Sequence, residues 1–537
     1  MNGADAIIKC LENEKVEVVY GYPGVAICPF YNSILNSDIK TVLIRTEQNA
    51  AHAASGLTRT SGGPGVCAVT SGPGATNLIT GIATAYADSI PLICITGQVT
   101  TDLLGSDGFQ EADITGAVES FVKYSYLVKN VNDIPRIFKE AFYIANSGRK
   151  GPVLIDIPFD IQTDEIKNFK YPDEVKLRTY KPTIKGNALQ IKKAVTALEK
   201  AKRPLICVGG GVILGGAVKE LRKFVEEYRI PVVSTMMGIS AMPTEHELYY
   251  GMVGNNGSPA ANRAMKEADF IMLVGARVAD RAVNQPEIVM KDTVLVHIDV
   301  DPAEIGKNAD FSIPIVGDSK SIFKDLNEYE VDCFCADWIS TLNEYREKLV
   351  VKRKTNSKYV DPAQFITKLS RKMKNDGIYV ADVGQNQIFS CRYHIVKEGR
   401  FLTTGGMGTM GYSIPAALGA KVGNPKKQVV CVCGDGSFQM SMMELATIKQ
   451  YDIKIKIIVF KNNFLGLVRQ YQHFNYKDKY SVTELEGTPD LEKLASAYDI
   501  NFIKVTKNDQ IDDAIDKFLK KDEAYLMEVD IDPMDLV

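Results

Sequence analysis

Short apolar runs, each followed by a turn of Gly, Pro or polar residues and then by a helical pattern, recur along the whole chain. In the first third they cover residues 16–20, 41–45, 66–70, 92–96 and 153–157. Because these runs are almost continuously apolar, the strands they predict must be buried on both faces. Strands of this kind that alternate with helices form parallel sheets covered by helices on both sides. The sequence therefore predicts an α/β protein with doubly wound parallel sheets.

The same unit returns in two later blocks, and a polar stretch precedes each of them. Residues 163–185 and 343–359 are rich in charged side chains and lack apolar periodicity, which is typical of linkers. We therefore predict three α/β domains, at residues 1–165, 186–325 and 358–537. The later strands are expected at residues 205–208, 231–234, 270–274 and 294–298 of the middle block, and at 378–381, 429–433, 455–460 and 526–530 of the last.

The composition excludes several classes of partner. Of the 537 residues 45% are hydrophobic and 24% are charged, and the formal net charge is −3. A charge so close to balance provides neither the basic surface that nucleic acid requires nor a polybasic patch for a membrane surface. The apolar runs are strand-sized, so no transmembrane helix is expected. The ten cysteines fall mostly within predicted strands, and the amino terminus does not resemble a signal peptide. We expect reduced thiols, a cytoplasmic location and small-molecule partners.

Two of the predicted strands end in residues that suit a metal-bound diphosphate. The run at 429–433 leads into Gly-Asp-Gly-Ser, and the run at 455–460 leads into Lys-Asn-Asn. The glycines let the backbone approach a ligand closely, and Asp435 supplies a hard oxygen for a divalent cation. Gly-Asp-Gly alone also suits a plain tight turn. The amide oxygen of Asn462, 27 positions after Asp435, favours the metal site.

Glu47 follows the predicted strand at 41–45 and opens a helical segment. A Glu in the first turn of a helix is favoured by the helix dipole, and that structural role is one interpretation. The other is a carboxyl group that faces an apolar cleft and exchanges a proton with a ligand. The nearby loop at 71–77, Ser-Gly-Pro-Gly-Ala-Thr-Asn, is small enough to leave room for a flat ring.

Several ordered segments, which together span the chain, resemble the thiamine-diphosphate-dependent enzymes, and more narrowly the large catalytic subunit of acetolactate synthase. They are VLIRTEQ at 42–48, SGPGATNLITGIATAYADSIPLICITGQV at 71–99, GFQEADITG at 108–116, SGRKGPVLIDIP at 147–158, GGMGTMGYSIPAALGA at 405–420, GDGSFQMSMMELAT at 434–447 and the loop at Asn462.

The resemblance implies that thiamine diphosphate lies between two chains, with its diphosphate on the third domain and its pyrimidine ring on the first domain of the partner. It implies that Asp435, the side chain of Asn462 and the main-chain oxygen of Phe464 hold Mg²⁺, and that Glu47 bonds the pyrimidine ring. At this loop Lys461 replaces the family's usual first Asn. The positions that match cofactor contacts are Gln385, Asn386 (usually His), Gly408, Thr409, Met410, Gly436, Ser437 and Gly466.

Further matches imply that the middle domain binds FAD, which in this branch has no net redox role. Asn256 departs from the family, where His is common. The positions that match the FAD site are Arg149, Gly209, Gly210, Gly211, Thr235, Met236, Met237, Gly275, Arg277 and Asp299.

The resemblance also assigns catalytic or substrate-facing positions, and several of them depart from the family. With Glu47, the matching residues are Gln110, Lys123 and Arg281, of which Arg281 could pair with a substrate carboxylate. The usual Gly-Gly-Ala is Gly24-Val25-Ala26, a usual Lys is Phe159 and a usual Trp is Tyr471. The extra bulk of Val25 and the smaller Tyr471 point to a pocket of altered shape.

We therefore expect a transferase that decarboxylates pyruvate and joins the two-carbon unit to a second 2-oxo acid, giving acetolactate, as in branched-chain amino acid biosynthesis. The alternatives are a related carboligase with an aldehyde or keto-sugar acceptor, a 2-oxo acid decarboxylase, and a non-enzymatic binding protein, which the presence of Glu47 and Asp435 disfavours. An active site between chains requires a homodimer or homotetramer. A regulatory subunit is left open.

Overall fold

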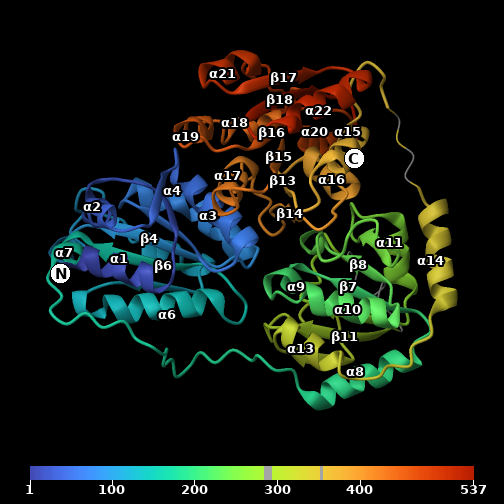
Figure 1. Ribbon diagram of the computed structural model, residues 1–537, viewed down its shortest axis with the longest axis horizontal. Coiled ribbons are helices and arrows are strands. Elements are labelled where there is room, and N and C mark those ends of the chain that lie inside the picture. Colours follow the sequence, from blue (N-terminus) through green and yellow to red (C-terminus); the bar gives the residue numbers. More distant parts are fainter. Residues whose placement is uncertain (284–292, 351–352, 354) are drawn as a thin grey trace.

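The computed structural model describes residues 1–283, 293–350, 353 and 355–537. These residues form three six-stranded sheets covered by helices, and Figure 1 shows them as three lobes. Every pair of neighbouring strands is parallel, so the predicted α/β class with doubly wound parallel sheets is confirmed. Each predicted domain range contains all the strands of one sheet, and we keep the three ranges as our proposed division.

The first sheet has the order β2-β1-β3-β4-β6-β5. Its inner strands β3, β4 and β6 are buried along their whole length, as their continuous apolar runs require. The strands are β1 (Val18–Tyr22), β2 (Lys40–Leu43), β3 (Gly65–Val69), β4 (Leu92–Gln98), β5 (Tyr124–Leu127) and β6 (Val153–Pro158). The helices are α1 (Gly3–Asn13), α2 (Cys28–Ser33), α3 (Glu47–Ser61), α4 (Pro73–Ala87), α5 (Ile114–Ala117), α6 (Ile134–Asn146) and α7 (Phe159–Thr163).

The second sheet has the order β12-β11-β10-β7-β8-β9. Asn187, Ser258 and Asp318 cap the amino ends of three of its helices with their side-chain oxygens. The strands are β7 (Pro204–Val208), β8 (Val232–Ser234), β9 (Tyr249–Met252), β10 (Phe270–Val274), β11 (Val294–Asp299) and β12 (Ile313–Val316). The helices are α8 (Ala188–Lys200), α9 (Gly210–Leu214), α10 (Val218–Tyr228), α11 (Pro259–Glu267), α13 (Ser319–Leu326) and α14 (Ala336–Lys348).

The third sheet has the order β14-β13-β15-β16-β18-β17. The strands are β13 (Ile378–Ala381), β14 (Arg400–Leu402), β15 (Val429–Gly434), β16 (Lys456–Lys461), β17 (Asn501–Val505) and β18 (Tyr525–Asp530). The helices are α15 (Pro362–Lys372), α16 (Gln385–Tyr393), α17 (Ser413–Gly423), α18 (Asp435–Gln439), α19 (Glu444–Gln450), α20 (Gly466–Asn475), α21 (Leu491–Ala497) and α22 (Ile511–Lys520).

The strands that the sequence analysis did not predict all lie at sheet edges. They are β5, β9, β12, β14 and β17, whereas β2 is an edge strand that the apolar runs do predict. An edge strand has a neighbour on one side only, so polar residues interrupt its apolar run. In β5 and β17, for example, most residues are exposed or half-buried.

The winding of each sheet reverses at one place: between β1 and β3, between β7 and β10, and between β13 and β15. The loops that follow the carboxyl ends of two such strands separate and leave a crevice where ligands bind. The loops at the three crevices are residues 23–25 with 70–74, 209–211 with 275–277, and 382–386 with 435–437. The crevice loops contain predicted cofactor contacts such as Gly210, Arg277 and Ser437, whereas Lys123 lies at the opposite edge of its sheet.

The first and third lobes join through α3 and α17. A Cβ atom added to Gly56 would lie 1.9 Å from the main-chain oxygen of Ala416, and one added to Gly419 would lie 1.8 Å from that of Ala53. Only glycine permits so close an approach of two helices at these points. The two helices therefore fix the first domain against the third within one chain, as Figure 1 shows.

The two predicted linkers differ. Residues 164–187, all of them described, form no helix or strand. Two hydrogen bonds hold this segment against the first lobe: Tyr171 donates to the carboxylate of Glu14 (2.8 Å), and Tyr180 donates to the main-chain oxygen of Ser147 (2.7 Å). In the second linker, predicted at 343–359, α14 continues to Lys348, and residues 351, 352 and 354 lie outside the described part.

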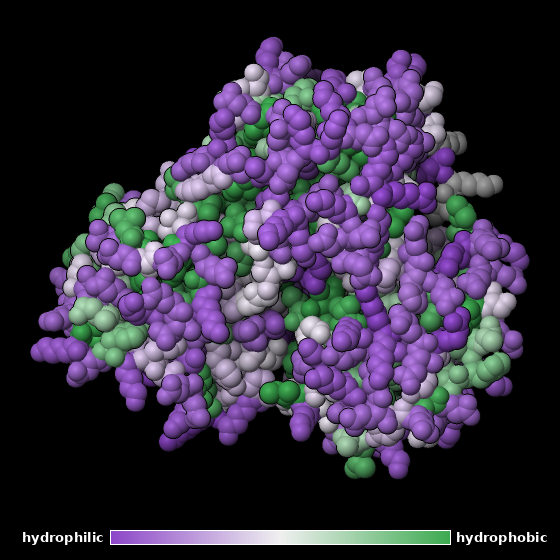
Figure 2. Space-filling model, viewed as in Figure 1, coloured by the Kyte–Doolittle hydropathy of each residue, from purple (hydrophilic) through white to green (hydrophobic). Residues whose placement is uncertain are grey.

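On the face in Figure 2 hydrophilic residues dominate, and apolar residues are visible chiefly in the recesses between lobes. Among the described residues, no helix combines the length and the apolar character needed to cross a bilayer.

Candidate active site

The carboxyl group of Asp435 lies at the carboxyl end of β15 and is almost completely buried, with 1% of the residue exposed. Its Oδ1 accepts the N–H of Gly436 (3.1 Å), and its Oδ2 accepts the N–H of Asn463 (2.6 Å). Burial raises the pKa of Asp435 to about 6, although these N–H groups oppose the rise. A bound cation would offset the cost of burying the charge.

Asn462 follows β16, the neighbour of β15, and is also buried. Its Oδ1 accepts the N–H of Phe464 (3.0 Å), and its Nδ2 points to Oε1 of Gln385 (3.4 Å). The three predicted metal ligands thus lie on two loops that follow the neighbouring strands β15 and β16, and the bond from Asn463 to Asp435 joins these loops. Asn463 is exposed, has a φ of 58°, and contributes its main-chain N–H to Asp435.

Glycines allow close packing around these loops. A Cβ added to Gly466 would lie 2.2 Å from Oε1 of Gln385, and one added to Gly436 would lie 3.6 Å from the terminal methyl of Met410. Met410 therefore lies beside the Gly-Asp-Gly turn, where the resemblance places an apolar support for the cofactor. Ser437 turns its hydroxyl to the N–H of Gly434 (3.1 Å).

Asp382, which the sequence analysis did not single out, holds the loop that carries Gly408, Thr409 and Met410. It directly follows β13, is 1% exposed, and accepts the N–H groups of Gly411 (2.9 Å) and Ser413 (2.8 Å). Burial raises its pKa. Its position directly after an apolar strand is the sequence feature that could have identified it.

Two further predicted contacts lie in the same crevice. Asn386 donates from Nδ2 to the main-chain oxygens of Asp382 (2.8 Å) and Val432 (3.2 Å), which leaves its Oδ1 on the side of Gly434. Thr409 shares a hydrogen bond of 2.7 Å with the hydroxyl of Thr84 on α4, so the first domain helps to position this loop.

Glu47 is the first residue of α3 and is half-buried. Its Oε2 accepts Nδ2–H of Asn77 (3.1 Å), and its Oε1 lies 3.4 Å from where a Cβ on Gly74 would stand. Gln110, with a φ of 61°, packs against Gly72 of the same turn. Glu47, Asn77 and Gln110 thus form one cluster, and among the described residues no hydrogen bond joins it to Asp435 or Asn462.

A cavity of about 670 Å³ lies between the three lobes. Most positions that match an FAD site line it, and so do Asn256, Arg281 and Gly408. Gly209 does not: a Cβ there would lie 2.1 Å from the main-chain oxygen of Gly275, so this glycine permits close packing of two loops instead. The matching residues that line the cavity are Arg149, Gly210, Gly211, Thr235, Met236, Met237, Gly275, Arg277 and Asp299.

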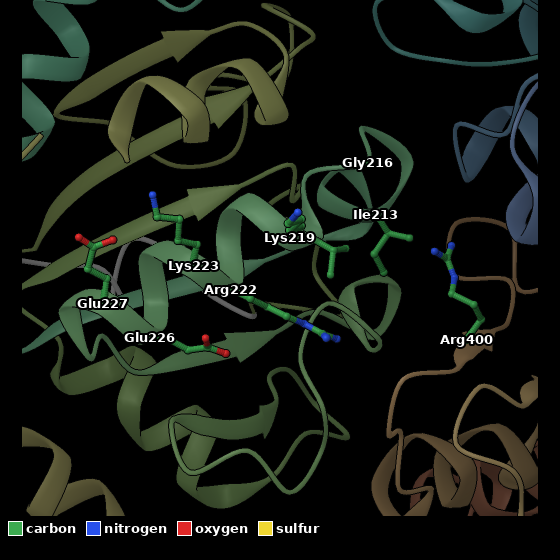
Figure 3. Close-up of a pocket in the computed structure, with 9 residues that line it drawn as sticks. Ile213, Gly216, Lys219, Arg222, Lys223, Glu226, Glu227 and Arg400 are labelled. Atoms are coloured by element: carbon green, nitrogen blue, oxygen red, sulfur yellow. The ribbon is translucent and has the colours of Figure 1, made fainter. Parts of the chain in front are cut away.

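The charged residues of this cavity are partly paired. Arg149 donates to the carboxylates of Glu304 (2.8 Å) and Asp301 (3.2 Å), and Arg277 donates to the main-chain oxygen of Ala87 (2.6 Å). Burial raises the pKa of Asp299 to about 6. A shallower groove lies beside the cavity and shares Arg400 with it, and Figure 3 shows Lys219, Arg222 and Lys223 of α10 along this groove.

Three family descriptions match the chain in order: "Thiamine pyrophosphate enzyme, N-terminal TPP binding domain" at residues 1–117, the central domain at 191–326 and the C-terminal TPP binding domain at 382–529. The probable acetolactate synthase large subunit of Methanocaldococcus jannaschii is 43% identical, over 99% of this chain and 92% of that protein. The chain belongs to the acetolactate synthase large-subunit family. The Haemophilus influenzae large subunit is 40% identical over 99% of this chain and 95% of its own, and isozyme 3 of Escherichia coli is 40% identical over 97% and 92%.

Membership of the acetolactate synthase family makes the chain a thiamine-diphosphate-dependent enzyme and removes the non-enzymatic alternative. The resemblance seen in the sequence motifs is confirmed. The strand-end geometry agrees with this membership, since the residues that family motifs place at the diphosphate meet at the crevice of the third sheet.

Lys123, which the acetolactate synthase motifs suggest as catalytic, lies apart from the Glu47 cluster, and its catalytic role stays a prediction. Lys123 precedes β5, so it lies at the amino-terminal edge of the sheet, whereas Glu47 follows a carboxyl end. Its ammonium donates to Tyr180 (2.7 Å) and to the main-chain oxygens of Ser147 (2.8 Å) and Ile144 at the end of α6. Burial lowers its pKa to about 8. Lys123 thus joins α6 to the linker within this chain.

The positions that depart from other acetolactate synthases lie in separate places. Val25 is 77% exposed at the crevice of the first sheet, and Tyr471 is 59% exposed on α20. Phe159 begins α7 and is half-buried. Arg281 is exposed on the cavity wall, with Nε 4.0 Å from the carboxylate of Asp280.

Proposed function

We propose that this chain decarboxylates pyruvate and joins the two-carbon unit to a second pyruvate, giving acetolactate. The observation that carries the proposal is the bond between the loop of Asn462 and Phe464 and the buried carboxyl group of Asp435 at the neighbouring strand end. The relatives of this chain that match almost its whole length are acetolactate synthase large subunits. The place of this reaction in branched-chain amino acid biosynthesis follows from the product.

In this proposal Asp435, the side chain of Asn462 and the main-chain oxygen of Phe464 hold Mg²⁺, and Gly434 leaves room for a diphosphate. Two observations support it: burial raises the pKa of Asp435, and the nearest atom to a Cβ placed on Gly434 would be Oδ1 of Asn386, at 3.6 Å. Thiamine diphosphate, when bound, supplies the electron sink for decarboxylation.

Glu47 holds a proton at its carboxyl group and exchanges it with the pyrimidine ring in this scheme. Asn77 orients the carboxyl group by its hydrogen bond to Oε2. Gln110 and the small residues of the loop at 71–74 enclose the same space and limit access of water. Arg281 is the candidate partner for a substrate carboxylate, because its guanidinium is exposed on a cavity wall.

We propose a homodimer, or a homotetramer built from it, in which Glu47 of one chain faces Asp435 of the other. Within one chain the two residues belong to separate hydrogen-bonded clusters. Exposed apolar side chains on and after α20 support a covered surface there: Val468 is 47% exposed, Phe474 65% and Val482 94%. Because its relatives are called large subunits, we also propose that a smaller regulatory subunit binds.

The cavity between the lobes is our proposed FAD site. Its volume of about 670 Å³ lies within the range of cofactor pockets. Gly210, Gly211 and Gly275 let the backbone approach a ligand, and Arg149 and Arg277 supply positive charge for a diphosphate.

A different acceptor is the second candidate function. Val25 adds an exposed branched side chain at the crevice of the first sheet, at a position where the resemblance implies Gly. An aldehyde or a keto-sugar would then accept the two-carbon unit in place of pyruvate.

Incubation of the purified protein with thiamine diphosphate, Mg²⁺, pyruvate and a panel of acceptors, with mass spectrometry of the products, tests both candidates. We expect acetolactate as the main product. A faster reaction with an aldehyde would favour the second candidate, and no product with any acceptor would contradict both.

A further inference from the structure

The segment at 99–112 carries Gln110, and one side chain holds its two ends together. We call these two ends, Val99 and Ala112, the neck of the segment. Gln98, the last residue of β4, is 3% exposed. Its Oε1 accepts the N–H of Val99 (2.9 Å), and its Nε2 donates to the main-chain oxygen of Ala112 (2.7 Å). One amide group thus bonds to both ends of the segment, so its orientation decides whether the neck is closed.

Asp156 fixes that orientation. It lies on β6, the neighbour of β4, and is 1% exposed. Its Oδ2 accepts from Nε2 of Gln98 (3.0 Å), and its Oδ1 accepts from the hydroxyl of Thr96 (2.6 Å). Because Oδ2 of Asp156 accepts whether the carboxyl group is ionised or carries a proton on Oδ1, it favours the amide orientation that presents Nε2 to Asp156 and Ala112, and Oε1 to Val99.

A second carboxylate holds the next residues of the segment. Asp160, in the first turn of α7, accepts the N–H of Thr101 (3.0 Å) and its hydroxyl (2.5 Å). Nearer the tip, Glu111 accepts the N–H groups of Gly108 (3.0 Å) and Gly105. The tip itself is open, since Phe109 is 89% exposed. The segment therefore depends on its polar base, and not on apolar packing at its tip, for its position.

Through Gln110 the segment contacts the turn that lies beside Glu47. Gln110 adopts a left-handed φ of 61°, and its main-chain oxygen lies 2.9 Å from where a Cβ on Gly72 would stand. Gly72 begins the turn whose Gly74 lies against the carboxyl group of Glu47. A shift of the segment at its neck would thus move Gln110 relative to Glu47.

We infer that Asp156 and Gln98 are positioning residues that hold segment 99–112, and with it Gln110, against the Glu47 cluster. They touch neither substrate nor cofactor in this account and act through the neck of the segment. The effect of this inference on the kinetics rests on the proposed function, because it assumes that Gln110 contacts the reacting molecules. Its effect on the position of segment 99–112 does not rest on that function.

Two variants test the inference. Asp156→Asn keeps the shape of the side chain but can present an N–H₂ group to the Gln98 amide. Gln98→Met keeps the length of the side chain and removes its bonds to Val99, Ala112 and Asp156. Glu140→Gln is the matched control, since Glu140 accepts from Tyr126 (3.0 Å) in the same domain but far from the segment along the chain. Hydrogen exchange of the full-length apoprotein is measured first, and steady-state kinetics with pyruvate second.

In both variants we expect amide exchange within 99–112 to rise about ten-fold, with the rest of the first domain unchanged and the control like the wild type. If the competent position of the segment is then populated about one-tenth of the time, the KM for pyruvate rises by about the same factor while kcat is kept. Unchanged exchange in 99–112, or a rise spread evenly over the first domain, would overturn the inference. Faster exchange in 99–112 with unchanged KM would keep the neck contact and reject the role of Gln110 in the proposed function.

Discussion

The carboxylate of Asp88 accepts the main-chain N–H of Gly406 at 2.8 Å, and through this bond the first domain holds a loop of the third. Asp88 caps the carboxyl end of α4 and is 6% exposed, and it also accepts the N–H of Gly405 (3.2 Å). The same loop lines the cavity between the lobes and continues into Thr409 and Met410. One buried carboxylate thus positions a segment that faces both proposed cofactor sites.

Replacement of Asp88 by Ala should destabilise the protein by about 2 kcal/mol, because the N–H groups of Gly405 and Gly406 lose the acceptor that ties their loop to the first domain. Burial raises the pKa of Asp88, and the nearby positive charges of Arg59 and Arg277 oppose the rise. The contribution of Asp88 to the free energy of unfolding is therefore the difference between two opposing effects. Urea unfolding of the variant checks the prediction. Asp102→Ala, at an exposed position of the same domain, is the control. Equal unfolding free energies for Asp88→Ala and wild type would contradict it.

Asp435→Ala should abolish the stabilisation that Mg²⁺ and thiamine diphosphate together give the wild type, because the metal loses the one charged group among its proposed protein ligands. The melting temperature, measured with and without both ligands, reports the effect. Removal of Mg²⁺ by a chelator should mimic the variant. Asp452→Ala, in which an 86% exposed side chain is removed, should keep the full shift. A ligand-dependent shift that survives in Asp435→Ala would remove this residue from the metal site.

Lys123→Met should lower stability and leave C2 proton exchange of bound thiamine diphosphate unchanged, because the ammonium of Lys123 bonds to the end of α6 and to Tyr180. Glu47→Gln should keep stability and cofactor binding and should suppress the exchange of the C2 proton. NMR exchange of the C2 proton and a thermal melt of both variants separate the two roles. Suppressed exchange in a stable Lys123→Met would restore the catalytic interpretation.

The sequence alone predicted the inner strands of each sheet and one edge strand, β2, and it missed the other edge strands. The run at 429–433 became β15 because every one of its residues is buried, whereas β17 alternates exposed and buried residues and gives no continuous apolar signal. The strand orders, and with them the crevices, depend on contacts between distant segments that no local pattern encodes.

The same limit applies to the candidate site. Asp435 and Asn462 stand directly after apolar strands, and their meeting follows from the parallel pairing of β15 with β16. Lys123 also matched a family motif, but its bonds to residues 144, 147 and 180 became visible only in the folded chain. Asp88 and Asn77 lie within the motif at 71–99, but that motif did not give their roles, which depend on the N–H groups of another domain and on the orientation of Glu47.

Asp156 should make the stability of the protein depend on pH in a defined direction. Burial raises its pKa from 3.8 to about 7, and the negative charge of Asp113, the nearby titratable group, adds to the rise. The native state therefore keeps a proton that the unfolded state loses, so this contribution to stability is complete below pH 3.8 and is lost as the pH rises to about 7. Between about pH 5 and about pH 7, the melting temperature of the wild type should fall relative to that of Asp156→Asn. Above that range the difference between the two melting temperatures should stay constant. A difference that stays constant over the whole interval would show that Asp156 is ionised throughout in the native protein.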